Sequence, residues 1–109
     1  MITIDQLIEI KQRLFDKSQA LSKSKGHDYS GQAGDTFKNI RVAETFGMKA
    51  EKGVLIRLMD KVMRISNYLD QDAFAVKDES LEDTIIDAIN YLTYIYALHE
   101  ERKDALPKV

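Results

Sequence analysis

The chain has 109 residues, a net charge of −2, no cysteine, no tryptophan and only two histidines. Without cysteine it can form no disulfide, no thiolate metal site and no cysteine nucleophile, and two histidines argue against a multi-histidine zinc or iron site. The nearly neutral balance excludes an overall basic field for duplex nucleic acid, and 44% hydrophobic with 31% charged residues is typical of a globular chain.

The sequence shows no pattern of a membrane span or of a signal peptide. No apolar run approaches the roughly 20 residues of a membrane span, and the first residues lack the basic start and apolar stretch of a signal peptide. We therefore expect a single cytoplasmic domain, residues 1–109, with no membrane partner.

The first predicted element is a long helix. Thr3 and Gln6 match a capping box, and apolar residues recur at helical spacing from Ile4 to Leu21, which predicts a helix over about 4–23. Residues 24–35 contain three glycines with Ser, His and Asp between them, which predicts a loop. Long loops in small domains are often functional.

A short helix and a long one are predicted next. Asp35 or Thr36 suits the N-cap of a short helix, and Gly47 suits the C-cap of the same helix. A third helix is predicted over about 50–70. It has an apolar stripe and a polar stripe, the latter formed by Arg57, Asp60, Arg64 and Asn67.

The last predicted helix covers about 79–102, with Asp78 as its N-cap. Its predicted apolar stripe consists of Leu81, Ile85, Ala88, Leu92 and Ile95. No stretch has the pattern of a strand. The predicted fold is therefore all-α, a helical bundle of three long helices and one short helix.

Acidic residues concentrate on this last helix, since residues 78–109 hold eight acids and three bases. Spacings of 4, 4 and 3 place Glu79, Asp83, Asp87 and Asn90 on one line along it. Aspartate is unfavourable inside helices and like charges one turn apart repel, so Asp83 and Asp87 indicate a function. Mg²⁺, or alternatively Mn²⁺, prefers such oxygen ligands.

The other members of this predicted metal site have ordinary alternatives. Asp60 on the facing helix is the natural further ligand, but it can equally form an ion pair with Arg57 or Arg64. Glu79 can simply complement the positive end of the helix dipole.

Several residues are candidates for binding a phosphorylated substrate. Lys25, His27, Asp28 and Tyr29 gather in the glycine-flanked segment, where they could hold a phosphate and stack on a base, although each alone is an ordinary loop residue. Lys61 and Arg64 are surface residues or, beside a metal site, phosphate ligands. Asn90 completes the predicted substrate contacts. Tyr91, Tyr94 and Tyr96 are either packing residues or one of them faces a nucleobase.

Two patterns resemble a known superfamily. Residues 81–91, with an acid (Asp83), an apolar run and an asparagine seven residues on (Asn90), resemble the second metal-binding helix of the MazG-like all-α nucleoside triphosphate pyrophosphatases. Residues 25–30, 57–65 and 78–83 together are similar to a subgroup, the nucleotide-modification-associated domain of phage and bacterial proteins. The resemblance covers roughly residues 25–100.

The resemblance implies a helical bundle, usually dimeric or larger, that cleaves a nucleotide between its α- and β-phosphates with Mg²⁺. It matches Asp83 to the acid of the second helix and Asp60 to the last acid of the first metal-binding helix. That first helix normally carries Glu-Glu-x-x-Glu, whereas this chain has Ile56 and Arg57 before Asp60. The glutamate expected three residues before Asp83 is replaced by Ser80.

Two functions follow as expectations. The first is a Mg²⁺-dependent nucleotide pyrophosphohydrolase, a dimer or tetramer, with Asp60 and Asp83 as catalytic residues and with Asp60, Glu79, Asp83 and Asp87 holding the metal. The second is a non-catalytic module that sequesters or senses a signalling nucleotide, which the thinned set of acids favours. A purely structural helical-assembly protein is the third reading.

Overall fold

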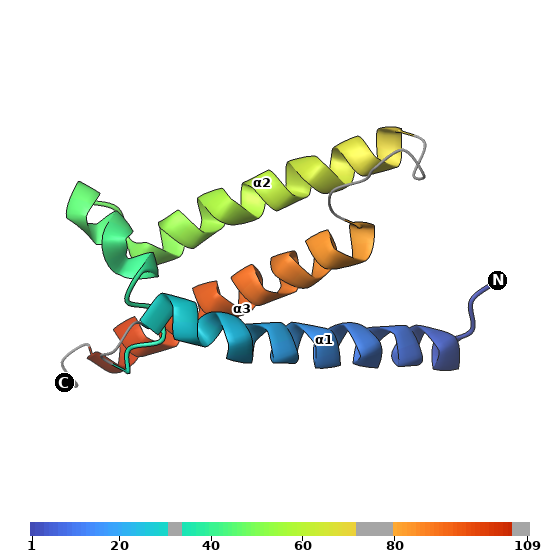
Figure 1. Ribbon diagram of the computed structural model, residues 1–109, viewed down its shortest axis with the longest axis horizontal. Helices are drawn as coiled ribbons and strands as arrows, with labels where there is room; N and C mark the ends of the chain where they lie inside the picture. The colour runs from blue at the N-terminus through green and yellow to red at the C-terminus, as the bar shows by residue number, and fades with distance from the viewer. Residues whose placement is uncertain (31–33, 72–79, 106–109) are drawn as a thin grey trace.

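The computed structural model describes residues 1–30, 34–71 and 80–105, and of residues 26–30 only the backbone. The described residues form α-helices α1 (Ile4–Ser30), α2 (Ala50–Asp70) and α3 (Leu81–Ala105) and the 3₁₀ helix η1 (Ile40–Phe46), shown in Figure 1. No strand occurs among these residues. The all-α prediction is therefore confirmed.

Helix α1 begins as predicted and ends later than predicted. The Thr3 N–H donates to Gln6 Oε1 at 2.9 Å and the Gln6 N–H donates to Thr3 Oγ1 at 3.2 Å, which confirms the capping box. The predicted loop is wrong for residues 24–30, because the helix continues through Gly26 to Ser30. A glycine inside a helix destabilises the helix by only about 1 kcal/mol relative to alanine. The hydrogen bonds of Ser22, one turn earlier, to α3 can outweigh this loss.

In the connection to α2, the described residues 34–49 are held by local hydrogen bonds. The Asp35 carboxylate accepts the Phe37 N–H at 3.1 Å, while the residue that precedes η1 is Asn39, without a side-chain cap. Gly47 ends η1 in the left-handed conformation, with φ at 75°, and its N–H bonds back to the Glu44 carbonyl at 3.0 Å. The predicted C-cap is confirmed.

Helix α2 has the predicted bounds, and α3 begins two residues later than predicted. Ser80 is its cap, since Ser80 Oγ accepts the Asp83 N–H at 3.0 Å. The predicted N-cap, Asp78, and the predicted helical residue Glu79 both lie outside the described residues.

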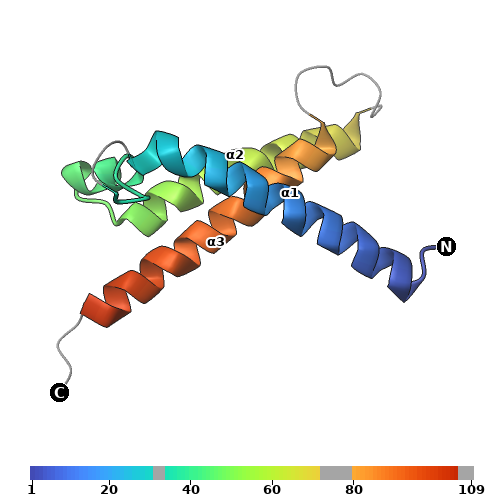
Figure 2. The ribbon, with the colours of Figure 1, turned by 60° about the horizontal axis from the view of Figure 1, so that its bottom comes forward.

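Helices α2 and α3 pack as an antiparallel hairpin, and α1 crosses α3 while its N-terminal half projects beyond it (Figures 1 and 2). The core lies where η1, α2 and α3 meet, and its buried residues are Ile40, Ala50, Val54, Tyr94 and Leu98. The Phe37 ring packs edge-on against Tyr94, with 5.5 Å between the centroids.

The predicted apolar stripe of α3 is only partly buried, and Ile95 is its member that packs against the core cluster. Leu92 is exposed and the other four residues of that stripe are only half-buried. The buried positions of α3 are instead Thr84, Ile86, Asn90, Tyr94 and Leu98. The fully buried face differs from the predicted stripe because Ser22 of α1 supplies a polar partner for Asn90 and Tyr94, so the face that carries them can be buried.

Ion pairs fix the α3 C-terminus to the rest of the fold. Arg41 bonds to Asp35 at 2.8 Å and to Glu101 at 2.7 Å, which raises the pKa of the guanidinium and lowers that of the Asp35 carboxyl. Arg102 donates two bonds of 2.9 Å to Glu51, and these lower the Glu51 pKa to about 2. The second pair joins α3 to the first turn of α2.

Candidate functional site

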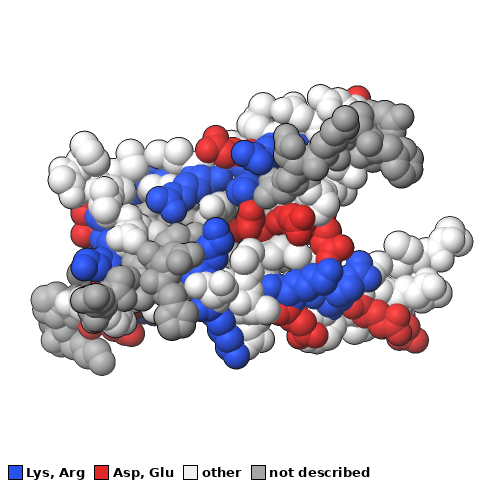
Figure 3. Space-filling view, in the orientation of Figure 1, with Lys and Arg blue, Asp and Glu red and all other residues white. Residues whose placement is uncertain are grey.

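Two adjoining cavities lie between α1 and α3, and the smaller one also borders α2. The larger, about 390 Å³, is lined by Lys17, Leu21, Lys25, Asp83, Ile86 and Asp87. The smaller, about 110 Å³, is lined by Leu21, Lys25, Lys61, Asp87, Asn90, Tyr91 and Tyr94. Leu21, Lys25 and Asp87 belong to both, so we treat them as one polar cleft. Figure 3 shows acidic side chains gathered in the hollow between the helices, with basic ones at its border.

A buried hydrogen-bond network forms one wall of the polar cleft. Ser22 Oγ donates to Asn90 Oδ1 at 3.0 Å and lies 2.9 Å from the Tyr94 hydroxyl oxygen. Asn90 and Tyr94 are only 6% and 8% exposed. A buried polar group without a hydrogen-bond partner would destabilise the fold, and these bonds supply the partners. The network holds α1 against α3, and it explains why a polar residue is buried at position 90.

An ion pair crosses the cleft from α2 to α3. Lys61 Nζ lies 2.8 Å from Asp87 Oδ2, and the two side chains are 15% and 24% exposed. Partial removal from water strengthens the attraction between these charges. Sequence reasoning gave the two residues separate roles, as phosphate and metal ligands, because the register of α2 against α3 cannot be read from either helix alone.

Asp83 and two lysines of α1 form the mouth of the cleft. Asp83 is exposed, and its position in the first turn of α3 suits a negative charge near the positive end of the helix dipole. Lys17 and Lys25 lie on the same face of α1 as Leu21, because four-residue spacing returns to one face. Lys17 also pairs with Glu82. Sequence reasoning missed Lys17, because the predicted loop over residues 24–35 contained Lys25 and the two lysines therefore did not fall on one predicted helix.

Two predicted site residues on α2 lie outside the described lining of the polar cleft. Asp60 and Arg64 are exposed on α2 and do not belong to the described lining of either cavity, although they flank Lys61 in sequence. The side chains of His27, Asp28 and Tyr29, and all of Glu79, lie outside the described residues. Within the described ranges, no three Asp, Glu or His side chains form a group that could hold a metal ion.

Comparisons of the chain with protein-family models, with curated proteins and with solved structures found no match. Among the helices described, none has both the length and the apolarity needed to cross a membrane. The arrangement of the polar cleft is therefore the basis for a functional proposal.

Proposed function

We propose that this chain is a Mg²⁺-dependent nucleotide pyrophosphohydrolase that cleaves between the α- and β-phosphates and works as a homo-oligomer, a dimer or tetramer. The observation that carries the proposal is the polar cleft, where Asp83 and Asp87 share one cavity with Lys17 and Lys25. The cleft has the size of a small-molecule site, and its mixture of carboxylates and ammonium groups suits a metal–phosphate ligand. The resemblance of residues 25–100 to MazG-like pyrophosphatases supports the same reading.

The donor groups of the cleft fit Mg²⁺ or Mn²⁺. Asp83 and Asp87 are one helical turn apart on α3 and both line the same cavity. Mg²⁺ is commonly held by one or two carboxylates, with waters and substrate phosphates completing its shell. Asp60 and Glu79 remain proposed as further ligands. When bound, the ion neutralises phosphate charge and lowers the pKa of a coordinated water.

The chain's own cations would bind the phosphates. Lys25 lines both cavities and Lys61 lines the inner one, so a phosphate in the cleft lies within reach of both ammonium groups. Lys61 would then exchange part of its interaction with Asp87 for the phosphate. Arg64 is proposed for a more distal phosphate.

The nucleoside would be held by the rest of the predicted set. The Asn90 side-chain oxygen accepts the bond from Ser22. Its side-chain NH₂ group is a separate donor, and we propose that this group hydrogen-bonds the substrate. His27, Asp28 and Tyr29 are proposed to contact the sugar or base. Asp83 and Asp60 are the proposed catalytic carboxylates.

Pyrophosphate release from a panel of nucleotides with Mg²⁺ tests this function. We expect turnover of at least one nucleotide, and a loss of at least about 100-fold on Asp83→Asn, because the isosteric amide carries no charge. Asp5→Asn, at the exposed start of α1, is the matched control and should keep full activity. Absence of turnover on every nucleotide by folded protein would refute the proposal.

A second function is favoured by one observation, the Lys61–Asp87 ion pair. An Asp87 carboxylate engaged by an ammonium group suits a cleft that only binds phosphate, in a module that sequesters or senses a nucleotide. Calorimetry in EDTA is the test: tight binding without metal and without product would favour this function. Loss of that binding on Asp83→Ala would count against it, since the acid need not hold a metal there.

A further inference from the structure

The α2–α3 hairpin leaves an apolar surface uncovered. Its members are Leu55, Met59, Val62 and Leu69 on α2 and Leu92 and Tyr96 on α3, which we call the apolar face. Their exposed fractions run from 41% at Leu55 to 69% at Leu69. With roughly 200 Å² for a fully exposed side chain of this size, the face exposes about 700 Å², more than a typical monomer's largest apolar patch.

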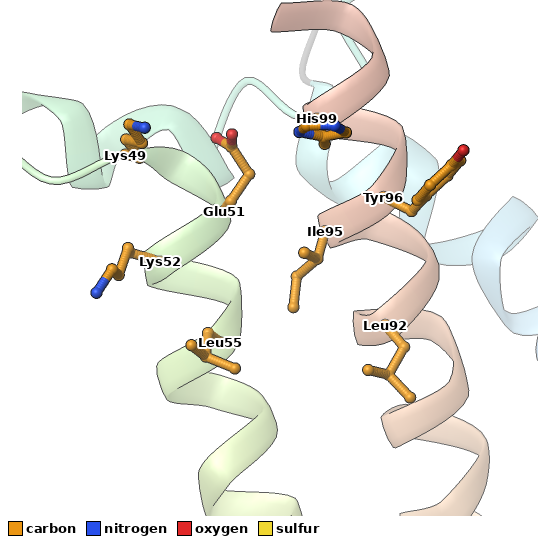
Figure 4. Close-up of a pocket in the computed structure, with 8 residues that line it drawn as sticks. All are labelled: Lys49, Glu51, Lys52, Leu55, Leu92, Ile95, Tyr96 and His99. Carbon is orange, nitrogen blue, oxygen red and sulfur yellow. The ribbon is translucent and has the colours of Figure 1, made fainter. Parts of the chain in front are cut away.

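The residues of the apolar face follow a regular spacing. The four on α2 fall at spacings of 4, 3 and 7, as in the seam of a helix that packs against partner helices. Leu92 and Tyr96 are one turn apart on α3. Figure 4 shows Leu55 and Leu92 pointing toward each other across a groove of about 480 Å³ between the two helices. The groove is lined by Leu55, Leu92 and Tyr96 of the apolar face, so the parts of the face on α2 and α3 meet there.

The apolar face and the polar cleft lie on different sides of the hairpin. Leu92 is two residues from Asn90 and Tyr96 is two residues from Tyr94, and a two-residue step turns an α-helix by about 200°. The same step separates Met59 from Lys61 on α2. Since α1 covers the Asn90 and Tyr94 side, it cannot also cover the apolar face.

The whole chain exposes more surface than a monomer of its mass normally does. Its accessible surface is 8401 Å², whereas the scaling for folded monomers gives about 6,200 Å² at 12.5 kDa. Its radius of gyration is 16.5 Å, against about 13 Å for a compact chain of this length. The apolar face is one part of this open surface, and the projecting N-terminal half of α1 is another (Figure 1).

We propose that the apolar face packs against the same face of a second copy of this chain, so that two α2–α3 hairpins form a four-helix interface related by a two-fold axis. A second copy is the indicated occupant because about 700 Å² approaches the roughly 800 Å² that each partner contributes to a stable interface. A two-fold axis also pairs a patch with itself, so the seam needs no other complementary surface. The proposal names the surface for the homo-oligomer proposed above, and it does not depend on catalysis.

Light scattering coupled to gel filtration gives the first test. The chain should elute with at least twice its 12.5 kDa mass, and Met59→Glu should lower that mass to a monomer's because it places a charge in the interface. Val42→Glu is the matched control, since Val42 on η1 is 55% exposed and Met59 is 52% exposed. It should leave the mass unchanged, and circular dichroism verifies that both variants are helical. A monomeric wild type would overturn the proposal.

Cysteine labelling tests the surface without disrupting it, because the chain has no cysteine of its own. Single variants Met59→Cys, Val42→Cys and Leu7→Cys are reacted with a maleimide in the native state. We expect Met59→Cys to react at least about tenfold more slowly than Val42→Cys, since only the former is covered. Equal rates at these two sites would overturn the proposal. So would protection of Leu7→Cys alone, which would assign the interface to α1.

Discussion

Replacing Lys61 by methionine should destabilise the fold by about 2 kcal/mol, because it leaves the Asp87 carboxylate without its ammonium partner. Asp87 is 24% exposed and Lys61 is 15% exposed, so water restores only part of the lost interaction. Removing one partner of a fully buried pair costs about 3–5 kcal/mol, while exposed pairs contribute about 0.2–1 kcal/mol. The burial of this pair places the expected loss between those limits.

A double-mutant cycle separates the ion pair from the other contacts of each side chain. The cycle uses Lys61→Met, Asp87→Asn and the double variant, each unfolded by urea at one fixed protein concentration. We expect a coupling energy of about 1–2 kcal/mol, as for a hydrogen bond between charged groups. The Lys17–Glu82 pair, with side chains 54% and 35% exposed, provides a control cycle in which we expect less than about 1 kcal/mol.

A coupling for Lys61 and Asp87 no larger than that of the control pair would refute this reasoning. The same variants also bear on the metal proposal. If Mg²⁺ binds at Asp87, adding it should raise the stability of Lys61→Met more than that of the wild type, because the cation replaces the lost ammonium charge. Asp87→Asn should show no such gain.

Glu51→Gln should lower stability at pH 7 and remove part of its acid dependence. Arg102 lowers the folded-state pKa of Glu51 to about 2 from 4.5. The Glu51 carboxylate therefore contributes its full share of the unfolding free energy above pH 4.5, and this share is lost as the pH falls toward 2. Urea unfolding at several pH values measures the loss. Ser80→Ala should cost about 1 kcal/mol of unfolding free energy by removing the α3 cap, and Ser80→Asp should cost much less. Gly47→Ala should cost about 1–2 kcal/mol, measured the same way, because φ is 75° there.

The features that the sequence predicted well depend on near neighbours in the chain. The Thr3–Gln6 capping box, the Gly47 C-cap and the bounds of α2 each rest on residues a few positions apart. The continuation of α1 through Gly26 could not be read in this way. The turn before Gly26 is in contact with α3, since Ser22 bonds to Asn90 and Tyr94 far along the chain, and such contacts cannot be seen in the local sequence.

The site shows the same division between local and distant information. Spacing alone placed Asp83, Asp87 and Asn90 on α3, and the structure gathers all three at the polar cleft. The Lys61–Asp87 pair and the burial of Asn90 depend on how three helices are aligned against one another. Apolar residues occur on both sides of α3, so the pattern could not decide which side faces the chain's own core.

The placement of the polar cleft and the apolar face on different sides of one hairpin predicts that binding and assembly can be separated. Asp83→Asn should weaken nucleotide binding while leaving the oligomer mass unchanged, because Asp83 lies at the cleft mouth and outside the apolar face. Met59→Glu should reduce the mass and leave nucleotide affinity in calorimetry within about threefold, provided that the monomer stays helical. Loss of binding by a helical monomer would contradict this separation, because it would mean that the second copy shapes the cleft.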